Sequence, residues 1–111
     1  MMKRADRLQW LHDFFKGTVR TSRQKIGDGP WHDKRSSDFL SALDADFVNR
    51  YIDATGATYR PMMIGADRCA MLSSDLKALH DAGILSRHST GISGMGPGWP
   101  RWVWLYSLTN P

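Results

Sequence analysis

The strongest constraint on the fold is a change of periodicity at Gly83. Upstream of this glycine, apolar residues recur at the spacing of one helical face: Cys69, Leu72, Leu76 and Leu79. The spacing predicts an α-helix over residues 67–82 with that face buried, and Gly83 supplies the left-handed residue that often follows a helix. Downstream, WPRWVWLYSL alternates with the period of two that is typical of a β-strand.

The alternating part predicts a β-hairpin. The stretches ILSRHSTGI and WPRWVWLYSL flank SGMGPG, whose glycines and proline are typical of a turn. A hairpin with one covered face is only marginally stable alone, so large aromatic residues should pin it against the helices. We therefore expect Trp102, Trp104 and Tyr106 to be core residues or residues at the base of the hairpin rather than stacking platforms, and Trp99, beside the turn, to be the exposed tryptophan.

Four further elements are predicted upstream. Apolar residues at helical spacing indicate helices over residues 4–16 and 45–55, and a glycine follows each of them. Residues 38–43 are expected to form a short helical turn. Pro61 suits the first turn of a helix, which predicts a short helix over residues 61–64.

A short helix, a turn, a longer helix, AGIL and a hairpin with a glycine-rich tip together resemble a winged helix-turn-helix domain of the small bacterial or phage type. The resemblance covers residues 45–108, and its most specific part is SSDLKALHDAGILSRHSTG followed by WPRWVWLYSL. It implies an α+β fold, mainly helical, with the hairpin as a C-terminal wing and an additional N-terminal helix. The implied organisation is an N-terminal helix (1–17), a basic linker or arm (18–37) and a winged-helix domain (38–111).

The charge balance favours an anionic partner. The chain carries 15 Lys and Arg residues against 11 Asp and no Glu, which gives a net charge of +4. Nucleic acid is the commonest anionic partner of a small basic domain. No apolar run approaches the roughly 18 residues that span a membrane, and a secreted domain of this size would usually carry paired cysteines rather than Cys69 alone. We therefore expect a cytoplasmic protein with no membrane contact.

No pattern in the sequence predicts catalysis. Cys69 falls on the predicted buried helix face, where a free cysteine usually acts as a small apolar residue. His80 and His88 do not have the spacing of a metal site. The stretch GMGPG lacks the Gly-Lys-Ser/Thr sequence of a phosphate-binding loop. We therefore expect a protein that is not an enzyme and that holds no metal or cofactor.

The leading hypothesis is a sequence-specific protein that binds double-stranded DNA, most simply a transcriptional regulator. In it, helix 67–82 lies in the major groove. There Arg68 contacts guanine, and Ser73 or Ser74 bonds to bases or phosphates. Lys77 and Arg60 neutralise phosphate.

Two further segments are expected to contact the DNA backbone or the minor groove. The wing would contribute Arg87, His88 and Arg101. The basic arm would contribute Arg20, Arg23 and Lys25. A solvated linker is the alternative for this arm.

The main alternative is a winged-helix module that binds another protein, as an adaptor or inhibitor. It is motivated by the weak charge of the predicted recognition helix, where Asp67, Asp75 and Asp81 outnumber Arg68 and Lys77.

A third possibility is single-strand binding, with Trp99 and Trp102 as stacking platforms. We also predict a homodimer, because helix 4–16 carries two apolar stripes, one with Leu8 and Leu11 and the other with Trp10. Together they are wider than one small domain needs.

Overall fold

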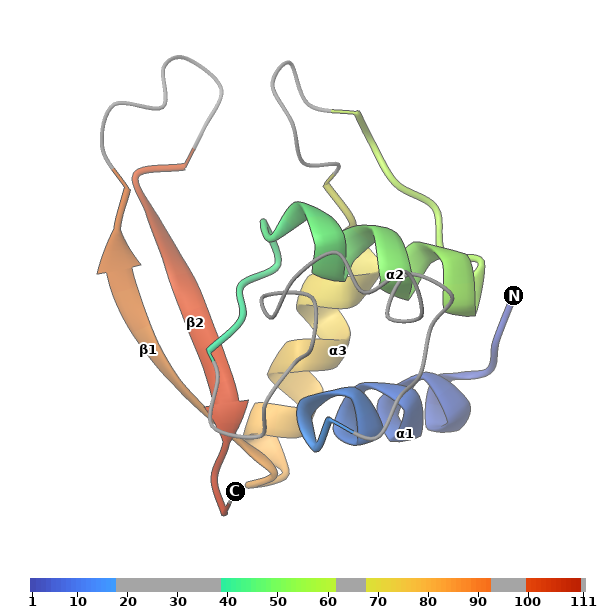
Figure 1. Ribbon diagram of the computed structural model, residues 1–111, viewed down its shortest axis with the longest axis horizontal. Helices are drawn as coiled ribbons and strands as arrows, with labels where there is room; N and C mark the ends of the chain where they lie inside the picture. Colours follow the sequence, from blue (N-terminus) through green and yellow to red (C-terminus); the bar gives the residue numbers. More distant parts are fainter. Residues whose placement is uncertain (18–38, 62–67, 93–99, 111) are drawn as a thin grey trace.

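The protein is an α+β fold of three helices and one antiparallel hairpin among the residues described. The structure, a computed structural model, describes residues 1–17, 39–61, 68–92 and 100–110 of the chain. In chain order the elements are α1 (Arg4–Phe15), α2 (Ala45–Thr55), α3 (Ala70–Asp81), β1 (Leu85–Gly91) and β2 (Trp102–Leu108). The helices lie together on one side and the hairpin stands beside them (Figure 1). The predicted fold class is confirmed at this level.

Both apolar stripes of helix α1 pack against the core of the same chain. Leu11, Phe14 and Phe15 are buried. Leu8 and Trp10 are partly buried against the same core, and the Trp10 ring stacks on Phe14 with centroids 5.2 Å apart. The apolar stripes therefore leave no spare face of the kind that motivated a homodimer, and the dimer stays a prediction without that argument.

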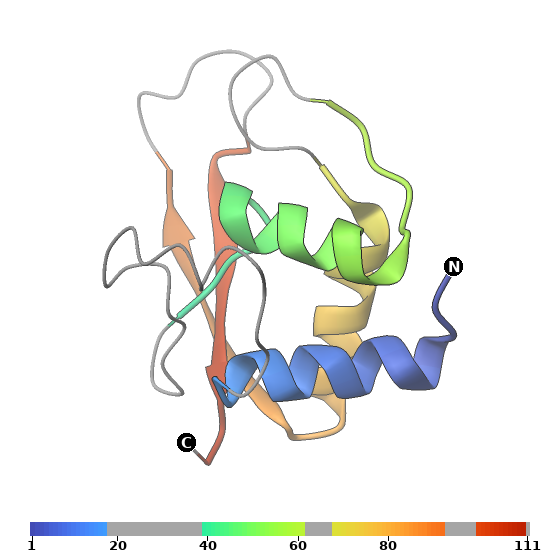
Figure 2. The ribbon, with the colours of Figure 1, turned by 45° about the vertical axis from the view of Figure 1, so that its right-hand side comes forward.

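Helix α2 has the predicted bounds, and apolar residues at helical spacing form its buried face. Phe47, Val48 and Tyr51 are buried, and Gly56 follows the helix with a φ of 74°. Phe47 stacks on Phe14 of α1 with ring centroids 5.1 Å apart. This contact joins α1 and α2, which lie one above the other in Figure 2.

Helix α3 begins later than the predicted residue 67. Cys69 has extended backbone angles, and the backbone N–H and C=O groups of Arg68 bond to those of Arg60, both at 2.8 Å. Because Arg68 is held in this antiparallel bridge, it cannot belong to the helix. The end of α3 is as predicted, since Gly83 follows it with a φ of 80°. Residues 62–64 of the short predicted helix lie outside the described residues, and Pro61 is not helical.

The hairpin pairs Leu85 with Leu108 and Gly91 with Trp102. Burial rises along β2 towards its end: Trp102 is 51% exposed, whereas Tyr106 is 4% exposed. The prediction that Trp102 is a core residue or lies at the base of the hairpin is therefore wrong, and Trp99 lies outside the described residues. Leu85 and Leu108 are buried at one end of the hairpin, and Trp102 pairs with Gly91 at the opposite end.

The segment before α2 also differs from the prediction. A helical turn was expected over residues 38–43, but only Ala42 and Leu43 form a turn, closed by the bond from Asp44 N–H to the Ser41 carbonyl at 3.2 Å. Leu40 instead bonds through its backbone to Tyr106, at 2.9 Å and 2.8 Å. Hydrogen bonding to the free edge of β2 is the physical reason, because strand-edge N–H and C=O groups need partners once they are buried. This bridge ties the start of α2 to the hairpin.

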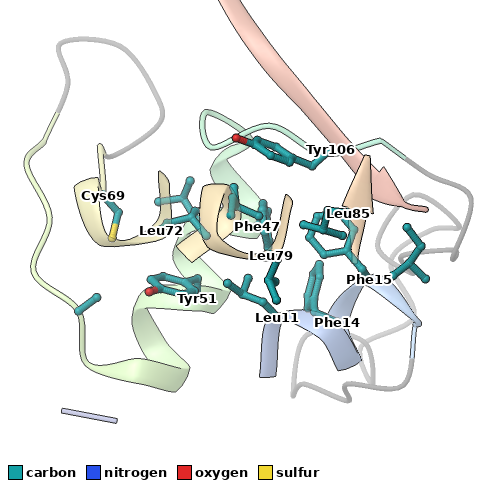
Figure 3. Packing of buried hydrophobic residues seen from close by; sticks show 14 residues of the cluster. Leu11, Phe14, Phe15, Phe47, Tyr51, Cys69, Leu72, Leu79, Leu85 and Tyr106 are labelled. Atoms are coloured by element: carbon teal, nitrogen blue, oxygen red, sulfur yellow. The ribbon is translucent and has the colours of Figure 1, made fainter. Parts of the chain in front are cut away.

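The core is continuous from α1 through α3 to the hairpin. Figure 3 shows Tyr51, Leu72 and Leu79 next to one another, with Leu11 and Leu85 continuing the cluster towards the hairpin. All five side chains are at most 3% exposed. The N-terminal helix therefore shares one core with the rest of the fold.

A buried polar cluster joins the three helices. The Nε atom of Arg7 donates to Asp75 at 2.8 Å, and the Tyr51 hydroxyl donates to the same carboxylate at 2.6 Å. Burial is the main cause that raises the pKa of Tyr51, and its hydrogen bond to Asp75 is the second. The hydrogen bond to Asp75 also raises the pKa of Arg7. One residue from each helix contributes, so the cluster fixes the orientation of α3 relative to α1 and α2.

Candidate nucleic-acid interface

One stripe of α3 faces solvent. Its exposed residues are Ala70, Ser73, Ser74, Lys77 and Asp81, which recur at helical spacing opposite the buried leucines. The first three have small side chains. A ligand surface can therefore come close to the α3 backbone along this stripe.

A groove lies between α3 and the hairpin. Its volume is about 390 Å³, and its lining includes three cationic residues, Arg68, Lys77 and Arg87, together with Ser73 and Trp102. No acidic residue lines it in the part of the chain that the structure describes. The groove thus brings together four of the predicted site residues. Arg68 precedes α3, Ser73 and Lys77 belong to α3, and Arg87 belongs to β1.

Arg87 is held in a fixed position on the wall of this groove. Its guanidinium carbon lies 4.0 Å from the centre of the Trp104 ring. One guanidinium nitrogen also lies 3.4 Å from the Tyr106 hydroxyl, which makes a weak hydrogen bond. Stacking on an aromatic face orients a guanidinium without neutralising its charge. Arg87 is therefore available to an anion with little loss of side-chain freedom.

Arg60 and Arg68 bring two like charges together. In an antiparallel pair that exchanges both backbone bonds, the two side chains lie on the same face. Both residues are exposed, and no acidic residue that the structure describes forms an ion pair with either. Like charges directly opposite each other are destabilising, and a bound anion would relieve that repulsion.

A second hollow opens on the other side of the exposed stripe. It has a volume of about 320 Å³ and is lined by Arg4, Ser74, Lys77, Ala78 and Asp81. Lys77 donates to Asp81 at 2.7 Å, and this bond is the main cause that lowers the pKa of Asp81. Lys77 borders both hollows, so the α3 stripe lies between them.

The other predicted site residues are not in the groove. His88 follows Arg87 on the strand and therefore faces the opposite side of the hairpin. There its ring packs edge-to-face on Phe39, with the two ring centroids 4.9 Å apart. Arg101 is exposed just before β2 but does not line either hollow. The basic residues of the predicted arm lie outside the described residues: Arg20, Arg23 and Lys25.

The acidic character expected for α3 is smaller than its sequence suggests. Asp75 is buried against Arg7, so it does not face a partner. Asp67 lies outside the described residues, and Asp81 is paired with Lys77. Asp75 lies about 60° from Leu72 on a helical wheel, at the border of the buried sector, so its burial was a possibility in the sequence.

The described residues contain neither a metal-binding cluster nor a membrane-spanning helix. Among the described residues, no three His, Cys, Asp or Glu side chains lie close enough together to hold a metal ion. Within the same residues, no helix has the length and apolar character that crossing a membrane requires.

Known proteins give no guide to this interface. No protein-family model, no curated protein and no solved structure matches the chain. A function has to be argued from the residues themselves.

Proposed function

We propose that this chain is a non-catalytic, sequence-specific protein that binds double-stranded DNA, most simply a transcriptional regulator. The observation that carries the proposal is the groove beside α3, whose lining contains Arg68, Lys77 and Arg87 and no described acid. Arg68 and Arg87 form no ion pair with a described acid, whereas Lys77 pairs with Asp81 outside the groove. Phosphate attraction supplies most of the sequence-independent affinity for DNA. A cationic hollow beside an exposed helix is the surface that such binding requires.

Helix α3 is the proposed reading element. With its side chains, an α-helix is about 10–12 Å wide, and the major groove of B-DNA is about 12 Å wide. Ser73 and Ser74 lie on the exposed stripe, and their hydroxyls can donate to or accept from base edges. Their small size permits the close approach that such contacts need.

The arginines around α3 are proposed to bind phosphates and so to fix the position of the protein on the duplex. Arg87 reaches the backbone from the hairpin, and Arg60 and Arg68 do so from the bridge that precedes α3. Since Arg68 lies outside the helix, backbone contact suits it better than the guanine contact predicted from the sequence. The order α2, α3 and hairpin is compatible with a winged helix, in which the hairpin would be the wing.

Protein binding was motivated by the acids of the predicted recognition helix, and of these Asp75 is buried against Arg7. Asp81 and Lys77 pair with each other, so their two charges favour neither a protein partner nor DNA. Single-strand binding is the second candidate, and the exposure of Trp102 favours it. This ring lines the cationic groove, and a base can stack on an exposed aromatic ring. The two candidates differ in whether the duplex or the free strand binds more tightly.

The test is a titration of fluorescent random-sequence DNA, as duplex and as single strand, at several salt concentrations. Tighter binding to the duplex with a strong salt dependence is expected, together with selection of a common site from a randomised pool. Tighter binding to the single strand with quenched tryptophan fluorescence would support the second candidate. Absence of binding to either at low salt would rule out both, and would return the protein-binding alternative to first place.

A further inference from the structure

The two hollows beside α3 place a cationic residue on each side of the exposed stripe. Arg87 borders the hollow on the hairpin side. Arg4, the first residue of α1, borders the hollow on the other side. Lys77 lies between them and lines both, so α3 has a flanking arginine on either side.

The position of Arg4 is fixed by its own helix. Arg7, one turn further along α1, forms the buried ion pair with Asp75 of α3. Residues three apart lie on the same side of a helix, so Arg4 is also directed towards α3. It is exposed, and no acidic residue of the described part of the chain is within ion-pair distance of it. Asp81 lies in the same hollow but is already bonded to Lys77.

A helix that fills the major groove has a phosphate backbone along each of its sides. Because the helix and the groove have about the same width, groups that flank the helix lie over the two strands rather than over the bases. Arg87 would lie over one strand and Arg4 over the other.

We infer that Arg4 binds a phosphate of the strand opposite the one that Arg87 binds, so that α1 and the hairpin grip the two strands of a duplex from either side of α3. The inference rests on the proposed function, because it assumes that α3 enters the major groove. It assigns Arg4 a role that charge and spacing in the sequence do not indicate. If Arg4 of α1 contacts the second strand, α1 contributes to the preference of the protein for a duplex over a single strand.

The test compares the variants Arg4→Gln, Arg87→Gln and Lys16→Gln in the full chain. Lys16 is the matched control, since it is exposed just after the opposite end of α1 and its substitution removes the same charge. Binding to a duplex and to one strand of the same sequence is measured across a series of salt concentrations. Each lost phosphate contact should lower the slope of log affinity against log salt by about 0.9 on a duplex.

The expected result is that Arg4→Gln and Arg87→Gln each lower the duplex slope by about 0.9. The double variant with both substitutions should lower the slope by the sum of the two effects. Lys16→Gln should leave the slope unchanged, and Arg4→Gln should not alter the slope for the single strand. Circular dichroism and the melting temperature should match those of the unchanged chain.

An Arg4→Gln slope equal to that of the unchanged chain would overturn this inference while the proposed function stands. So would an equal loss with Lys16→Gln, because that would indicate only a general effect of net charge. No DNA binding by the unchanged chain would overturn the proposed function and this inference with it.

Discussion

Arg7 and Arg87 both lie near a tyrosine hydroxyl, that of Tyr51 and that of Tyr106 respectively, but their surroundings differ in charge. Arg7 is buried and donates to the carboxylate of Asp75, beside the Tyr51 hydroxyl. Arg87 is half-buried and stacks on Trp104, with no carboxylate of the described residues in ion-pair contact. The first charge is neutralised within the fold, whereas the second keeps its charge at a surface hollow. The contrast separates cations that hold the helices together from cations that can bind a ligand.

The largest expected effect is a loss of stability when the buried pair of Arg7 and Asp75 is broken. Asp75→Ala leaves Arg7 buried without its carboxylate, and breaking a buried ion pair in this way costs about 3–5 kcal/mol of stability. Urea unfolding followed by circular dichroism measures the loss. Asp75→Asn keeps an acceptor for Tyr51 but removes the charge, so its loss should be smaller.

The matched control for this prediction is Asp81→Ala, which removes an exposed acid from the same helix. Exposed ion pairs contribute little to stability, so the unfolding midpoint should stay within experimental error. A loss for Asp81→Ala equal to that for Asp75→Ala would contradict the distinction between the two regions.

Much of the fold could be predicted from the sequence because its helices are local. The apolar stripe of α2 and the glycine after it fix its bounds, Ala45–Thr55, without help from other parts of the chain. The pairing of Leu40 with Tyr106 could not be predicted in this way, since it depends on where the free edge of β2 lies. The start of α3 was predicted too early for the same reason, because Arg68 pairs with Arg60, a residue outside the helix, and helical spacing does not indicate that pairing.

The site was predicted only in part. Arg68, Ser73, Lys77 and Arg87 were selected singly as candidates, and the structure brings them to one groove. His88 could have been excluded from that set, because adjacent residues of a strand face opposite sides. Arg4 was missed since its position beside α3 depends on the packing of helices that are far apart in the sequence.

A smaller effect is expected from the residue that supports Arg87. Trp104→Leu removes the ring beneath the guanidinium, so that Arg87 has to be ordered when DNA binds, which costs about 0.5–1.5 kcal/mol for one long side chain. We expect DNA affinity to fall by that amount in the unchanged chain and to fall by less in an Arg87→Gln background. A double-mutant cycle measures the difference.

Tyr106→Phe is the control for Trp104→Leu, because it removes only the weak hydrogen bond to Arg87. Its effect on affinity should be smaller than that of Trp104→Leu. Equal losses for Trp104→Leu with and without Arg87 would show that the ring acts independently of the arginine, as a stacking surface would.

The central claim is that the cations of the groove beside α3 bind phosphate, and the most direct measurement is the salt dependence of duplex binding by the triple variant Arg68→Gln, Lys77→Gln, Arg87→Gln. If each residue contacts one phosphate, the slope of log affinity against log salt should fall by about 2.7, which is three times the contribution of one contact. A triple variant that folds normally and binds duplex DNA with an unchanged slope would contradict the account.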